Sequence, residues 1–130
     1  MDVIATNGIK KADSLRSDLG LNMFQPINIY DTCKTLDLDV RFYRINMEGM
    51  YVSSDEPKNS RIILSSLRPF SRKVFTCAHE LGHHLYGHGS KIDAIQKESN
   101  KESTYNEEER VVDVFASALL MPIAGIQHEF

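Results

Sequence analysis

The stretch VFTCAHELGHHLY, residues 74–86, carries the clearest structural pattern in this sequence. Its apolar residues recur at intervals of three and four, which is the spacing of one face of an α-helix. These residues are Val74, Ala78, Leu81 and Leu85. Ser71 is a suitable N-cap before the helix, and Gly87 is typical of a residue that ends one. The stretch therefore predicts a helix with one continuous apolar face.

The same helix contains the motif His79-Glu80-Leu81-Gly82-His83, which has the form H-E-x-x-H. Two histidines four residues apart lie one turn above each other, so both imidazoles can bind one metal ion. Glu80 lies about 100° further round the helix, where its carboxylate can reach a water on that metal. The apolar face lies roughly opposite His79 and His83. We therefore expect the two histidines to face a cleft.

A catalytic zinc site usually has three protein ligands and one water, so the motif needs a third ligand. His88 lies five residues after His83, beyond the expected helix end, and His84 points about 100° away from the pair. Both are weak candidates. The better candidate is Glu109, on a last helix that we expect from near residue 107 to residue 121.

Two structural roles for Glu109 remain open on spacing alone. It belongs to a run of acidic residues that would favour a helix N-terminus, and with Asn106 it resembles a capping box. Asp113 lies one turn after Glu109 in a stretch that is apolar nearly all round, so we expect it to be buried and to need a partner. A ligand imidazole would be such a partner, and the carboxylate would fix its tautomer.

The rest of the chain predicts an α+β fold, in which helices pack around a small sheet. We expect a first helix that ends at Gly20 and a short second helix opened by Pro26. Three strands are expected near residues 38–43, 50–53 and 62–65, joined as an antiparallel meander because their connections are short. Ile62–Leu64 is a candidate edge for an extended peptide, with an ordinary interior strand as the alternative. Residues 90–106 are polar and are expected to form a loop. The charged stretch 91–110 is expected to be a solvated loop, with a mobile flap over the cleft as the alternative.

Composition sets the broad class. The 130 residues suit one domain, with an N-terminal helix in 1–25 and a core in 26–125. The 42% hydrophobic and 25% charged fractions exclude a disordered or fibrous chain, and the net charge of −3 disfavours direct nucleic-acid binding. We expect no signal peptide, no membrane span and a cytoplasmic location. Cys33 and Cys77 are too few for a disulfide framework and read as small buried residues.

The H-E-x-x-H helix followed by Glu109-Arg110-Val111-Val112-Asp113-Val114-Phe115-Ala116-Ser117-Ala118-Leu119-Leu120-Met121-Pro122 resembles the ImmA/IrrE family of metallopeptidases. That family shows the pattern E-x-x-A-[ND]-x-F-A-x-x-L-L-M-P. The chain departs from it at Val112, where the family usually has alanine. The resemblance covers roughly residues 30 to 125, and leaves the first helix unmatched.

This resemblance implies a thermolysin-like zincin core with His79, His83 and Glu109 as metal ligands and Glu80 as general base. It implies hydrolysis of peptide bonds in a protein regulator, since family members include proteases that cleave helix-turn-helix repressors. Zinc suits two histidines and one carboxylate, although Mn²⁺ or Fe²⁺ fit as well. Two alternatives are a non-proteolytic, metal-containing module that binds a transcription factor and a hydrolase of another amide. We also expect an oxyanion-stabilising residue, and the sequence does not rank the candidates Tyr86, Tyr105 and His84.

Overall fold

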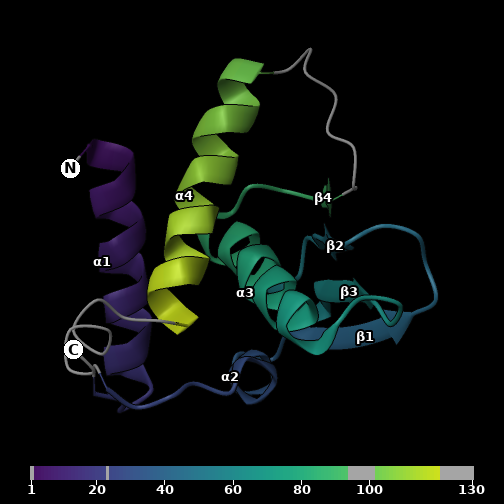
Figure 1. The fold of residues 1–130 in the computed structure, drawn as a ribbon, viewed down its shortest axis with the longest axis horizontal. Coiled ribbons are helices and arrows are strands. Elements are labelled where there is room, and N and C mark those ends of the chain that lie inside the picture. The colour runs from purple at the N-terminus through teal and green to yellow at the C-terminus, as the bar shows by residue number, and fades with distance from the viewer. Residues whose placement is uncertain (1, 23, 94–101, 121–130) are drawn as a thin grey trace.

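The computed structural model describes residues 2–22, 24–93 and 102–120, which form helices and a mixed sheet (Figure 1). The α+β class predicted from the sequence is confirmed. In chain order the elements are α1 (Val3–Asp18), α2 (Ile29–Thr35), β1 (Asp39–Tyr43), β2 (Gly49–Val52), a short 3-10 turn (Pro57–Asn59), β3 (Arg61–Ser65), α3 (Phe70–Tyr86), β4 (Lys91–Asp93) and α4 (Glu102–Leu120). None of the helices in these ranges combines the length and the apolarity that a bilayer span requires.

The strands of the described sheet lie in the order β1-β3-β2-β4. β1 runs parallel to β3, whereas β2 runs antiparallel to both β3 and β4. The predicted antiparallel meander is therefore wrong. The observed strand order follows from burial. Ile62 and Leu64 are completely buried, so β3 takes an interior position in the sheet, and the mostly exposed β1 lies at its edge. For the same reason Ile62–Leu64 is an interior strand and offers no free edge.

The helices pack in layers beside the sheet (Figure 1). α3 lies against β2 and β3, α4 packs on α3, and α1 runs alongside α4 as the most extensive contact between two elements. The core is formed by completely or almost completely buried apolar side chains from all these layers. Its largest members are Phe115, Ile29, Ile62, Leu64, Leu81 and Leu119. α3 is thus held between the sheet and α4, which positions its central residues against α4.

The two cysteines lie in this core, as predicted. Cys33 on α2 and Cys77 on α3 are both completely buried, and their sulfur atoms lie 3.8 Å apart. The hydrogen bond from Cys33 and burial raise the pKa of the Cys77 thiol. Both side chains pack as small buried residues between α2 and α3.

The starts of α2, α3 and α4 differ from the prediction. α2 begins at Ile29 and not at Pro26, because the Asn28 side chain accepts hydrogen bonds from the amides of Tyr30 and Asp31. α3 begins at Phe70, one residue before the predicted cap, with Pro69 as N-cap and no side-chain cap. The C-terminal end of α3 is as predicted.

α4 begins at Glu102, about one turn and a half before the predicted start. Residues 102–106 are polar but contain neither proline nor glycine, so nothing local prevents the helix from extending there. Asn106 therefore lies inside the helix and does not cap it. The capping-box explanation of Glu109 is wrong, and Glu109 lies about two turns from the start of α4. Part of the predicted 90–106 loop, residues 94–101, falls outside the described residues.

Candidate metal centre

His79 and His83 lie one turn apart on α3, with their ring centroids 5.0 Å from each other. Both side chains are turned towards α4, which covers them: His79 is 5% exposed and His83 is 1% exposed. The sequence predicted that they would face a cleft. The structure instead buries them between two helices, because α4 packs closely on α3.

Glu109 reaches both histidines from α4. Its Oε1 lies 2.8 Å from His79 Nε2, and its Oε2 lies 3.1 Å from His83 Nε2. One donor atom from each of the three residues falls within 4.8 Å of the other two. Ligand atoms on one tetrahedral zinc at 2.0–2.1 Å are roughly 3.3 Å apart, so this spacing fits a single ion. Two imidazole nitrogens and one carboxylate are also a donor set that zinc accepts.

Glu109 is held as a carboxylate at this site. Burial by itself would raise the pKa of Glu109, but the hydrogen bonds from His79 and His83 outweigh it and hold the pKa well below its usual range. The side chain is therefore negatively charged at neutral pH. A buried negative charge beside two imidazoles is suited to a divalent cation, which would compensate that charge.

Asp113 lies one turn after Glu109 and contacts the other nitrogen of the same histidine. The Nδ1–H of His79 donates to Asp113 Oδ1 at 2.7 Å. The expectation that Asp113 is buried is wrong, since its side chain is 55% exposed at the margin of the α3–α4 contact. Its expected partner is nevertheless the one observed. This hydrogen bond leaves His79 Nε2 directed towards Glu109.

Glu80 follows His79 on α3 and is completely buried. It does not belong to the three-donor group of His79, His83 and Glu109. A carboxylate that acts on a water beside a metal is expected to lie near the ligands without being one of them. The role of Glu80 as general base stays a prediction.

His84 is directed to the sheet and not to the donor group. Its Nδ1 lies 2.6 Å from the hydroxyl of Tyr51 on β2. Burial lowers the pKa of His84, which favours the neutral ring and a hydroxyl that donates to Nδ1. Of the three residues considered as oxyanion stabilisers, Tyr86 donates its hydroxyl proton to Asn7 on α1. The Tyr105 side chain lies outside what the structure describes, so that role stays open.

The sequence did not predict the contact that His88 makes with His83. His88 does not join the donor group, but its Nδ1 lies 2.9 Å from Nδ1 of His83, on the side of that ring away from Glu109. A signal was present in the sequence. Gly87 is typical of a helix end that turns back, and such a turn brings the following residue towards the last turn of the helix.

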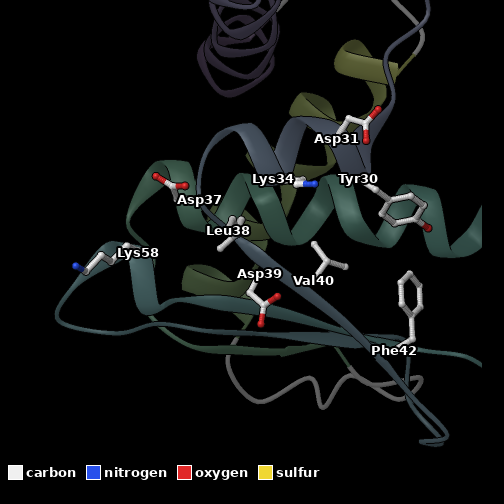
Figure 2. A pocket seen from close by; sticks show the side chains of 9 residues that line it. All are labelled: Tyr30, Asp31, Lys34, Asp37, Leu38, Asp39, Val40, Phe42 and Lys58. Carbon is white, nitrogen blue, oxygen red and sulfur yellow. The ribbon is translucent and has the colours of Figure 1, made fainter.

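A separate hollow of about 750 Å³ lies between α2 and β1 (Figure 2). Tyr30 and Phe42 approach each other at one end of it, with ring centroids 5.6 Å apart, and Lys58 lies at the other. Its lining mixes acidic, basic and apolar side chains. None of the three donors or Glu80 lines it.

Comparison with known families gives one result. Residues 33–130 match the model of the peptidase M78 family, described as the IrrE N-terminal-like domain. The match covers well over half of the chain and includes α3, α4 and every donor residue. It begins within α2, so α1 lies outside it. A search of the curated proteins found no match.

Proposed function

Because this chain belongs to the IrrE N-terminal-like peptidase family, we propose that it is a zinc-dependent endopeptidase. The family indicates a metallopeptidase-like function. The observation that carries the proposal is the convergence of His79, His83 and Glu109 from two helices. Helices α3 and α4 hold these donors as a thermolysin-like core would, with the H-E-x-x-H pair on one helix and a carboxylate on a later one.

The donors are arranged for one ion. His79 and His83 would offer Nε2 and Glu109 one carboxylate oxygen, while Asp113 keeps the proton of His79 on Nδ1. A zinc ion held there supplies Lewis-acid activation of the scissile carbonyl and lowers the pKa of a bound water towards about 7. Glu80 would accept the proton of the attacking water on a carboxylate oxygen and pass it to the leaving amine nitrogen.

The proposed substrate is a protein regulator, with a helix-turn-helix repressor as the first candidate. This part of the proposal is supported by the family resemblance of the motif and not by a contact. An extended peptide can add to a sheet through a free strand edge. The edges of the described sheet are β1 and β4, and β4 follows α3 after four residues, so we assign the peptide to the β4 edge.

The metal site is tested by elemental analysis of purified protein. We expect about one equivalent of zinc in the wild type and a much lower content in Glu109→Ala. Glu107→Gln is the matched control, because Glu107 is exposed on the same helix and should keep the zinc. A wild type that stays metal-free when zinc is supplied at neutral pH would contradict the proposal.

The catalytic role is tested with Glu80→Gln. We expect this variant to bind zinc as the wild type does and to lose cleavage of a repressor substrate. If Glu80→Gln retained every cellular activity, the non-proteolytic module that binds a transcription factor would be the better explanation. Metal-dependent turnover of small amides without cleavage of any protein would instead favour a different amidohydrolase.

A further inference from the structure

We propose that His88 is a positioning residue for the metal ligand His83, and that α1 holds His88 in place through Tyr86. This inference rests on the proposed metal site. It concerns a residue outside the H-E-x-x-H motif and a helix outside the family match.

The two nitrogens of His83 have different neighbours. Nε2 lies 3.1 Å from Glu109, on the side of the donor group, and Nδ1 lies 2.9 Å from His88 Nδ1. A neutral imidazole that binds a metal through Nε2 carries its proton on Nδ1. That Nδ1–H can donate to the unprotonated Nδ1 of His88. His88 would thus do for His83 what Asp113 does for His79. Each ligand ring would be oriented by a hydrogen bond from its Nδ1.

The backbone explains how His88 reaches His83. Gly87 adopts a left-handed conformation with φ +70°, and the amide of His88 donates to the carbonyl of His83 at 3.1 Å. This is the hydrogen bond of a Schellman motif, which places His88, the second residue after the helix, beside His83, the fourth-last residue of the helix. The contact between the two rings therefore follows from the way α3 ends.

Tyr86 and α1 restrict the ring of His88. The Tyr86 ring stacks on His88 with centroids 5.4 Å apart and 15° between the planes. The Tyr86 hydroxyl donates to the Asn7 side chain at 2.6 Å, and Lys11 lies over the Tyr86 ring at 5.0 Å. Asn7 and Lys11 both belong to α1. A chain of contacts therefore connects α1 to a metal ligand.

The test compares variants at position 88 by their zinc dissociation constant, measured in competition with a chelator. His88→Phe keeps an aromatic ring to stack on Tyr86 but has no acceptor, and we expect zinc affinity to fall about 10- to 100-fold. His88→Asn places an amide oxygen where His88 has Nδ1, and we expect it to restore most of the affinity. The visible absorption spectrum of the Co²⁺-loaded protein should change in His88→Phe and return in His88→Asn.

The stability of the metal-free protein shows whether His88 has only a structural role. The midpoint of thermal unfolding, Tm, of metal-free His88→Phe should stay close to that of the wild type. Zinc affinity of His88→Phe equal to that of the wild type would overturn this inference and leave the metal site standing. A wild type that binds no zinc would overturn both. A Tm loss in His88→Phe with no rescue of affinity by His88→Asn would also contradict the positioning role.

The contribution of α1 is tested with Asn7→Ala. Losing one hydrogen bond to Tyr86 should weaken zinc binding by about threefold, less than the loss at position 88. Ser14→Ala is the control, since Ser14 is exposed on the same helix. Equal affinity of Asn7→Ala and Ser14→Ala would exclude α1 from the proposed support.

Discussion

Gly82 on α3 lies so close to Val112 on α4 that a Cβ at position 82 would be 3.0 Å from the Cβ of Val112. The same Cβ would be 3.1 Å from the ring of Phe115. These distances are shorter than most real Cβ contacts, so a side chain at position 82 would require Val112 or Phe115 to shift by a few tenths of an ångström. The approach matters because Glu109 must reach His79 and His83 across the same contact.

Gly82→Ala should therefore separate α3 from α4. Alanine normally stabilises a helix relative to glycine by about 1 kcal/mol, but here overpacking should destabilise the protein by about 1–3 kcal/mol. We also expect weaker zinc binding. The measurements are chemical denaturation and chelator competition.

The double variant Gly82→Ala/Val112→Ala is the matched test of the cause. Val112→Ala removes the Cγ1 methyl that would lie 3.0 Å from the new Cβ, although the Val112 Cβ and the Phe115 ring stay in place. The double variant should therefore recover part of the lost stability and zinc affinity. Alanine at position 112 is also what the family pattern shows. A Gly82→Ala protein more stable than the wild type would contradict the close-packing explanation.

Asp113 should support metal binding through His79. Asp113→Ala removes the acceptor of the His79 Nδ1 proton, so zinc affinity should fall about 10- to 100-fold, whereas Asp113→Asn should retain part of it. The control is Ser117→Ala, one turn further along α4 and exposed. Because the Asp113 side chain is half exposed, the stability of the apoprotein should change little. Unchanged zinc affinity in Asp113→Ala would show that His79 needs no such support.

Arg16 should be essential for holding α1 on α4. It is 2% exposed, and its guanidinium donates to the carbonyl of Leu119 at 2.8 and 3.1 Å and to the carbonyls of Asn22 and Gln25. An ammonium group cannot reproduce this planar set of donors, so Arg16→Lys should cost on the order of 2–3 kcal/mol of unfolding free energy. Denaturant titration measures the loss.

Arg41→Lys is the matched comparison for Arg16→Lys. Arg41 pairs with Asp39 on the surface of β1 with its side chain 54% exposed, and its replacement should change stability by less than about 0.5 kcal/mol. Equal effects of the two substitutions would contradict the structural role of Arg16.

Asp2 should make the stability of α1 depend on pH. The hydrogen bond from the Ala5 amide and the contact with Arg110 hold the pKa of Asp2 below its ordinary value of 3.8. A lowered pKa means that the carboxylate stabilises the fold above about pH 3.8, and that this contribution is lost as the pH falls further. Asp2→Ala should thus lower Tm at pH 7, and its Tm should approach that of the wild type as the pH falls below 3.8. Asp18→Ala, at the other end of α1, should not lower Tm.

The spacing of residues within α3 was enough to predict most of this helix. The spacing of its apolar residues and the glycine at its end predict a helix from residues near 71 to 86, and the structure has Phe70–Tyr86. The pairing of His79 with His83 follows from 3.6 residues per turn, which does not depend on the rest of the chain. The third donor is different: spacing left Glu109 open, and the longer motif of the family singled it out.

Contacts between distant segments could not be read in this way. The sheet order failed because strand pairing depends on which strand is buried, and local alternation is the same for neighbouring and non-neighbouring strands. Asp113 was expected to be buried because its neighbours in sequence are apolar, yet it lies at the margin of the helix contact.

By itself, the sequence determined the α+β class, the helix that carries the H-E-x-x-H motif and the pair of histidines on one face, because these follow from interactions within a few residues. Only the tertiary structure decided that this face is covered by α4, that Glu109 meets both imidazoles and that His88 lies behind His83. The physical reason is close packing. The missing side chain of Gly82 and the turn at Gly87 set distances between segments that no periodicity in the chain specifies.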